Sequence, residues 1–273
     1  MRATPENDQK AYRLAKYYLA EILQIREPII EKYLNPLSIH PVQKSKNALY
    51  QRLLESAQNA NMKPKIIGDA IGGVDKLALI LNGFDPEYVS KTYGDNWEAV
   101  LDQIVEKLKP KGMVRRAPRS IWPSYCKTIL SAAEFIRQFD SIDKFFEWVD
   151  YFDRDDRSRA ALPMLLDHEI EGFGFALSCD FLKELGYVNF PKPDVHLRDI
   201  FTALELCPDG IDDYKLFKAI IRVARNASVT PYALDKVFWL IGSGNFYADP
   251  EIGFIGSHQK EFVDFARSNI TRP

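Results

Sequence analysis

The sequence predicts an all-α protein, and three observations support this. Apolar residues recur at helical spacing along most of the 273 residues, and no run has the alternation of a strand. Ser, Thr or Asp precedes several apolar stretches, as residues that cap helices do. Hydrophobic residues make up 46% of the chain and aromatic residues 12%, enough for a large core. We therefore expect about a dozen helices.

The N-terminal part is expected to be helical throughout. Its first helix carries an apolar stripe, and a later helix is capped by Asp95 and runs through Leu108. The stripe consists of Tyr12, Ala15, Leu19, Ile22 and Leu23. Two further helices are expected over residues 43–60 and 74–81, separated by proline and glycine breaks.

Residues 109–120 are polar and basic and contain two prolines and one glycine. This composition is typical of a connection between lobes. It places a domain boundary near residue 115, with an N-terminal helical region over 1–114 and a second helical lobe over 115–273.

The C-terminal part is expected to hold a longer series of helices. Ser141 and the pair Thr230-Pro231 are strong helix starts, and Gly242 is expected to end the helix that begins at Pro231. The expected helices cover residues 122–139, 145–152, 162–170, 175–185, 195–206, 214–227, 231–240 and 258–268.

A Gly-Phe-Gly turn joins the helices over 162–170 and 175–185. Gly172 and Gly174 can adopt positive φ without a Cβ penalty, and Phe173 can lock the turn into the core. The amides that open the next helix, at Phe175, would then point outward at its positive end, where a phosphate binds. An ordinary packing corner between two helices is the alternative interpretation.

Asp194 precedes the helix over 195–206 and follows Pro193. An Asp at this position caps free amides, and these bonds favour its ionised form. It could be a simple cap. It could also be a fixed anion beside a reacting deoxyribose, because cleavage of a glycosidic bond builds positive charge on the sugar.

Residues 170–201 resemble the helix-hairpin-helix element of the HhH-GPD superfamily of base-excision DNA glycosylases. The family pattern has a Gly-x-Gly hairpin before a helix and a catalytic Asp near the end of that helix, in a motif like PVDxHV. This chain has Gly172 and Gly174, then Asp194 followed by Val195 and His196. The resemblance extends loosely over 115–245. It implies a two-lobed helical fold with a DNA-width groove, and Asp194 as the catalytic carboxylate.

One position departs from the family pattern. Members that also cleave the strand have a lysine two residues after the second hairpin glycine, and this chain has Ala176 there. That lysine forms a Schiff base with the sugar. The resemblance therefore implies a monofunctional glycosylase that hydrolyses the N-glycosidic bond of a flipped, modified base. Lys183 lies two helical turns further on and is not expected to replace the lysine.

A basic segment over 107–127 is the expected DNA contact. It contains no acidic residue, and we assign phosphate contacts to four of its cations: Arg115, Arg116, Arg119 and Lys127. Trp122 and Tyr125 lie in the same segment and are expected to form a base pocket, because aromatic rings stack on a flipped base. A solvated charged loop is the alternative.

The bulk properties limit the remaining function classes. The net charge of −2 gives no overall signal for nucleic acid, so positive charge has to be concentrated locally. The three cysteines have no ligand spacing, and we expect no metal and no cofactor. The polar N-terminus and the lack of a long apolar run predict a cytoplasmic protein without membrane contact. The expected partner is double-stranded DNA with a modified base.

Two other functions stay open. A DNA-binding protein of the same fold could have lost catalysis, as Ala176 would permit. A helical interaction protein could use the Gly-Phe-Gly turn for packing alone. The sequence identifies neither the excised base, nor the oligomeric state, nor the role of residues 1–110.

Overall fold

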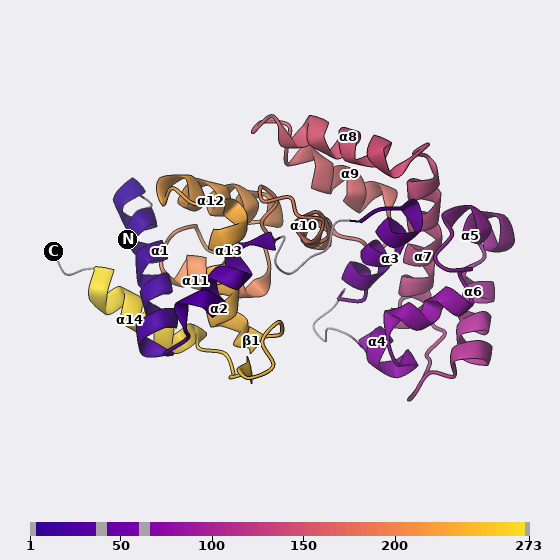
Figure 1. Cartoon of the computed structure of the whole chain (residues 1–273), viewed down its shortest axis with the longest axis horizontal. Coiled ribbons are helices and arrows are strands. Elements are labelled where there is room, and N and C mark those ends of the chain that lie inside the picture. The colour runs from indigo at the N-terminus through magenta and orange to yellow at the C-terminus, as the bar shows by residue number, and fades with distance from the viewer. Residues whose placement is uncertain (1–3, 37–42, 60–65, 271–273) are drawn as a thin grey trace. The chain divides into compact units, whose positions relative to one another are not determined.

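The computed structural model describes residues 4–36, 43–59 and 66–270, and it confirms the all-α class (Figure 1). The described residues form fourteen α-helices and a single pair of two-residue strands. They divide into two compact units. Unit 1 combines Met1–Val42 with Leu182–Pro273, and unit 2 is Gln43–Phe181.

These boundaries differ from the expected division at residue 115. The chain passes from unit 1 to unit 2 after Val42 and returns after Phe181. The basic segment over 109–120 therefore lies within unit 2 and does not connect two lobes. Composition alone could not show this, because an exposed basic loop inside a unit has the same residue types as a linker.

Unit 1 is built around helix α13 (Pro231–Ser243), which contacts α1, α2, α11, α12 and α14 (Figure 1). Thr230 caps α13 by accepting a hydrogen bond from the Ala233 amide at 3.1 Å, and Pro231 occupies the first turn, as the sequence predicts. The other elements of this unit are α1 (Pro5–Tyr17), a π-helical turn (Tyr18–Ile22), α2 (Glu27–Leu34), the end of α10 (Phe175–Glu184), α11 (Val195–Ala203), α12 (Asp213–Asn226), β1 (Asn245–Phe246), β2 (Gly253–Phe254) and α14 (Gln259–Ile270).

The end of α13 corrects one expectation. Gly242 lies inside the helix, and Gly244 ends it with φ +62°. A Cβ at Gly242 would lie 2.7 Å from the Cβ of His196, so the glycine lets α13 approach the start of α11. Residues past Gly244 form the antiparallel β1–β2 ribbon, in which Asn245 pairs with Phe254.

An ion pair between the buried Asp8 and the partly exposed Arg222 joins the first helix to α12. Asp8 on α1 is fully buried and accepts hydrogen bonds from Arg222 Nε at 2.9 Å and Asn226 Nδ2 at 2.7 Å. Both partners lie on α12. The pairing compensates the cost of placing a carboxylate in the core.

Unit 2 is built around α7 (Ile121–Arg137), which contacts α3, α5, α6 and α9. Most of α7 is buried, including its central alanines Ala132 and Ala133. The other elements of this unit are α3 (Lys46–Ala57), α4 (Ile66–Ile71), a 3₁₀ turn (Val74–Leu79), α5 (Pro86–Tyr93), α6 (Trp97–Gln103), a π-helical turn (Ile104–Leu108), α8 (Ile142–Asp153), α9 (Ala161–Glu169) and the first part of α10.

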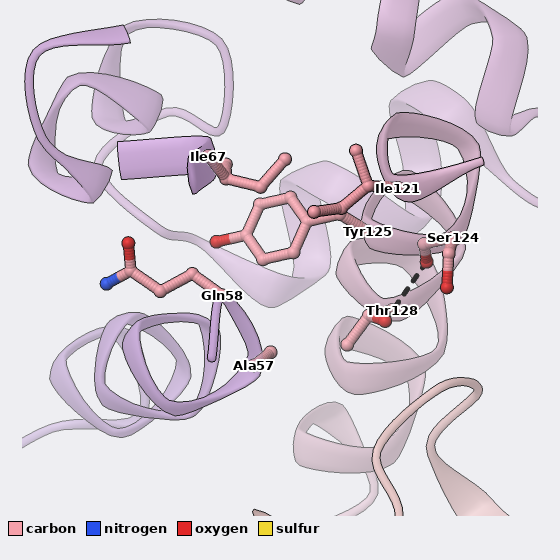
Figure 2. A pocket seen from close by; sticks show the side chains of 7 residues that line it. All are labelled: Ala57, Gln58, Ile67, Ile121, Ser124, Tyr125 and Thr128. Atoms are coloured by element: carbon pink, nitrogen blue, oxygen red, sulfur yellow. Dashed lines mark hydrogen bonds between the residues drawn. The ribbon is translucent and has the colours of Figure 1, made fainter. Parts of the chain in front are cut away.

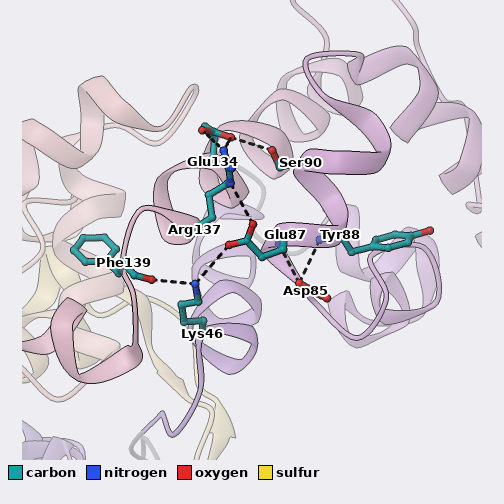
Figure 3. A network of polar contacts seen from close by, with 8 residues as sticks. All are labelled: Lys46, Asp85, Glu87, Tyr88, Ser90, Glu134, Arg137 and Phe139. Atoms are coloured by element: carbon teal, nitrogen blue, oxygen red, sulfur yellow. Dashed lines mark hydrogen bonds and ion pairs between the residues drawn. The ribbon is translucent and has the colours of Figure 1, made fainter.

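An exposed polar network joins α3, α5 and α7 (Figure 3). Glu87 lies between Lys46, at 3.7 Å, and Arg137, at 3.4 Å. Lys46 also donates to the carbonyl of Phe139, and Arg137 pairs with Glu134 at 2.8 Å. Because most of these groups are solvated, the network contributes little to stability compared with the apolar core of α7.

Among the residues that the structure describes, no helix is both long and apolar enough to cross a membrane.

Candidate functional site

The Gly-Phe-Gly turn is held on α7 by hydroxyl groups. Thr128 Oγ1 donates to the carbonyl of Glu171 at 2.7 Å, and Ser131 Oγ accepts from the Glu171 amide at 2.9 Å. Lys127 Nζ pairs with the Glu171 carboxylate at 2.9 Å. Three residues of one helix face therefore fix the backbone immediately before Gly172.

The two glycines of the turn have different reasons to be glycine. Gly172 has φ +75°, and a Cβ there would lie 3.2 Å from both the Ser124 and Thr128 hydroxyls. Gly174 does not have positive φ, contrary to expectation, and a Cβ there would meet nothing within 4 Å. The fold requires Gly172, whereas the surface over Gly174 is open to the approach of another molecule.

Helix α10 starts directly after the turn, as expected. Phe173 is fully buried, and Ser178 Oγ donates to the Phe173 carbonyl at 3.2 Å, which closes the corner. Phe175 is also buried, at 8% exposure, so only its backbone remains a candidate DNA contact. Ala176 is the second residue of α10 and is partly exposed.

The basic segment lies on the surface of unit 2, at the start of α7. Arg115, Arg116 and Arg119 are exposed, but Arg116 pairs with Asp102 at 2.7 Å. Lys127 is engaged by Glu171. Arg115 and Arg119 make no ion pair with any described acidic residue, so they contribute available positive charge to the segment, together with the exposed Lys109 and Lys111.

Trp122 and Tyr125 do not form the expected base pocket. Trp122 is 3% exposed and Tyr125 4%, and the Tyr125 hydroxyl donates to the Leu54 carbonyl at 2.9 Å. Tyr125 lines a small cavity with Gln58, Ile67 and Thr128 (Figure 2), whose free volume is about 10 Å³. That is space for about one water and not for a base. Both rings lie on the apolar face of α7, so they pack into the core although basic residues are close to them in the sequence.

Asp194 is the N-cap of α11 in unit 1. Its Oδ1 accepts a hydrogen bond from the Leu197 amide at 3.1 Å, as the sequence predicts. The expected effect on its charge is wrong: the pKa of Asp194 is raised, because burial outweighs the attraction of Lys192 and the other neighbours. The Asp235 carboxylate raises this pKa further, whereas His196 and the capping bond lower it.

A buried ion pair lies near Asp194. Lys183 Nζ, on the last turn of α10, is 2.9 Å from Asp235 Oδ2 on α13. The same Oδ2 accepts the Lys192 amide at 2.7 Å. No local pattern in the sequence indicates that Asp235 pairs with Lys183. The available signal was an Asp-Lys pair, residues 235–236, inside an otherwise apolar helix, since such charges are rarely buried unpaired.

Lys236, beside Asp235, lies among aromatic rings and is 3% exposed. Its Nζ is 5.2–5.6 Å from the ring centres of Tyr232, Trp239 and Tyr247 and donates to the Tyr247 hydroxyl at 3.0 Å. Rings at these distances attract a cation. The cluster anchors the β1–β2 ribbon to α13.

The cysteines of the chain are free and buried. Burial raises the pKa of the Cys126 thiol to about 12, which leaves it unreactive. Within the described residues, no three His, Cys, Asp or Glu side chains are grouped so that they could hold a metal ion.

No protein-family model and no curated protein matches the sequence. Solved structures do match. The 8-oxoguanine glycosylase/lyase of Methanocaldococcus jannaschii, in complex with a 15mer DNA containing 8-oxoguanine, matches at 13% identity, over 84% of this chain and 95% of that chain, with a TM-score of 0.50.

The 8-oxoguanine DNA glycosylase of Thermotoga maritima matches at 14% identity, over 86% of this chain and 97% of that chain, with a TM-score of 0.49. A further structure of the Methanocaldococcus jannaschii enzyme gives 14% identity and the same TM-score. At such identities the similarity concerns architecture and not chemistry. The chain therefore has the all-helical fold of the HhH-GPD DNA glycosylases.

Proposed function

We propose that this protein is a monofunctional DNA glycosylase, which excises a modified base from double-stranded DNA with Asp194 as its catalytic carboxylate. The observation that carries the proposal is Asp194 itself: within a glycosylase fold, it caps α11 and its pKa is raised by burial and by a second carboxylate. Groups with perturbed pKa values concentrate at functional sites.

The proposed reaction is hydrolysis. As the C–N bond to the base breaks, its electron pair leaves with the base and the sugar gains oxocarbenium character. The Asp194 carboxylate stabilises that charge. Water then forms the new bond to C1′, and its proton passes by way of the carboxylate to the departing base. The products are the free base and an intact strand with an abasic site.

Ala176 supports the hydrolytic course. A methyl group cannot form the imine that links a lysine amine to the sugar in strand-cleaving glycosylases. The buried Lys183 ammonium is held by Asp235 in the core of unit 1. We therefore expect no β-elimination through a lysine at the start of α10.

Roles in DNA binding are proposed for unit 2. The open backbone at Gly174 and the first amides of α10 suit a phosphate, because helix N-termini attract anions. Arg115 and Arg119 supply exposed positive charge. These contacts position the duplex and carry no sequence information.

The test is a panel of duplex oligonucleotides, each with one modified base, incubated with the full-length protein. The first substrate is 8-oxoguanine, which the Methanocaldococcus jannaschii structure contains; uracil, hypoxanthine and alkylated purines follow. Strand breaks are measured with and without alkali. We expect breaks only after alkali, and no covalent protein–DNA adduct after borohydride.

Breaks without alkali, together with efficient borohydride trapping, would overturn the hydrolytic assignment and show that another lysine acts. DNA binding without release of any base would support a non-catalytic DNA-binding protein. If the protein binds none of the duplexes, the remaining interpretation is a helical interaction protein without DNA affinity.

A further inference from the structure

Unit 1 buries two charged side chains against each other. The Lys183 side chain is 4% exposed and the Asp235 side chain 0%, and they meet at 2.9 Å. A buried pair of this kind is weak support for stability, because desolvation offsets most of the attraction. It therefore calls for another explanation.

The pair is connected to Asp194 through one short backbone path. Asp235 Oδ2 accepts the amide of Lys192 at 2.7 Å, and the carbonyl of Lys192 accepts the amide of Asp194 at 2.9 Å. A charged acceptor makes the first of these bonds a strong one. The turn that carries Asp194 is thus fixed to α13 at Asp235, and Asp235 is fixed to α10 by Lys183.

The second oxygen of Asp235 is unused. Oδ1 is buried and has no hydrogen-bond partner among the described residues. The groups that interact with the Asp235 carboxylate are Lys183 on α10, which contacts Oδ2, and Tyr232 on α13 and Asp194 before α11, whose pKa values it raises. The other charged groups that act on Asp194 are Lys192 and His196.

We propose that Asp235 is the positioning residue of Asp194, which it holds through the Lys192 amide while Lys183 fixes its carboxylate. The proposal rests on the proposed function for the catalytic role of Asp194, whereas the contacts of Asp235 do not depend on that role. Two effects follow. The clamp sets where the Asp194 carboxylate lies, and the nearby negative charge favours protonation of Asp194.

The experiment separates the two effects with matched variants. Lys183→Met removes the buried ammonium, so that neither double variant leaves it unpaired. In this background, Asp235→Asn keeps an acceptor for the Lys192 amide, and Asp235→Ala removes it. Asp235→Asn in the wild-type background removes the negative charge, keeps an acceptor for the Lys192 amide, and leaves the Lys183 ammonium facing a neutral amide. Asp264→Asn, at an exposed position of α14, is the control.

Two readouts need no activity: hydrogen exchange of the Lys192 amide, and the titration of the Asp194 carboxyl followed by carbon NMR. We expect exchange at Lys192 to be at least about tenfold faster in Asp235→Ala/Lys183→Met than in Asp235→Asn/Lys183→Met, since the amide loses its buried acceptor. In Asp235→Asn, we expect the Asp194 titration to move to lower pH by about half a unit or more. The control Asp264→Asn should change neither the exchange of the Lys192 amide nor the titration of Asp194.

A third readout is single-turnover base release from the substrate that the duplex panel identifies. Asp235→Asn/Lys183→Met should retain the plateau rate within about threefold, and Asp235→Ala/Lys183→Met should lose about tenfold or more. In Asp235→Asn the acidic limb of the pH–rate profile should move to lower pH. A general packing defect would lower the rate at every pH and leave the limb in place.

Equal Lys192 exchange in the two double variants, or an unmoved Asp194 titration in Asp235→Asn, would overturn the proposal even if the wild type is an active glycosylase. Absence of base release from every duplex by the wild type would refute the proposed function instead, while the exchange and titration results would still decide the role of Asp235.

Discussion

Asp194 caps α11 and is the proposed catalytic carboxylate, and one substitution can separate these two roles. Its Oδ1 caps α11, which Asn can also do, so Asp194→Asn retains the cap. Its folded-state pKa is raised, so the folded protein favours the protonated carboxyl; this contributes stability below the unfolded pKa near 4, and that contribution is lost as pH rises through the folded pKa.

Asp194→Asn should therefore be as stable as the wild type or more stable at pH 7, while base release falls by about 10²-fold or more. Thermal unfolding and single-turnover assays at pH 7 check the two parts, and DNA affinity should persist. A variant that is both unstable and inactive would indicate a purely structural Asp194. In the wild type, the acidic limb of activity should lie above the ordinary range of an Asp carboxyl, since the ionised form acts.

Gly174 and Gly172 give a second matched pair. An added Cβ at Gly174 meets nothing from the protein, so Gly174→Ala should change stability by less than about 1 kcal/mol, yet it should weaken DNA binding about tenfold by blocking the approach of a phosphate. Gly172→Ala should unfold more easily, because φ is +75° there. Unfolding midpoints and fluorescence anisotropy measure both. Unaltered DNA affinity of Gly174→Ala would remove the turn from the DNA contact.

The connections between helices are of two kinds, and they differ in what they contribute to stability. Asp8 joins α1 to α12 from within the core, whereas Glu87 joins α3, α5 and α7 in solvent (Figure 3). Asp8 is fully buried although its partner Arg222 is 39% exposed, and hydrogen bonds to a buried charged group contribute about 1.5–3 kcal/mol.

Asp8→Asn should therefore lower the free energy of unfolding by about 2 kcal/mol or more. Glu87→Gln should lower it by no more than about 0.5 kcal/mol, and that difference should disappear in high salt. Urea titrations of both variants at low and high salt measure the contrast. Equal losses would mean that the surface network is more cooperative than its exposure suggests.

The protein as a whole is slightly acidic, with a net charge of −2, so the proposed DNA affinity has to come from a local excess of positive charge. Arg115 and Arg119 are exposed without an acidic partner among the described residues, which makes them the clearest source.

Replacing both by Gln should weaken binding to every duplex and reduce the slope of log K against log salt by about two. Arg154→Gln, at an exposed site at the end of α8, is the control and should leave the slope unchanged. Anisotropy titrations over a range of salt concentrations give the slopes. If the double variant has the wild-type slope, the segment is only a solvated loop.

The sequence predicts most helices of this chain, because periodicity and caps such as Thr230 are local signals. It fails where distant residues decide. The division into units depends on the return of the chain to unit 1 after Phe181. The buried Tyr125 donates a hydrogen bond to Leu54, which belongs to another helix. Lys183 and Asp235 are 52 positions apart, so no local pattern could pair them.

The missing side chain at Gly242 has a consequence for how variants of this protein would be interpreted. A methyl group there would displace His196, two residues beyond Asp194, and the displacement would reach the carboxylate through a single turn of α11. Under the proposed function, a substitution at residue 242 would then imitate an active-site lesion although it touches neither substrate nor catalytic group. Among inactive variants, a substitution at position 242 would lose activity through a steric clash with His196, and this loss could be mistaken for the loss of a catalytic group.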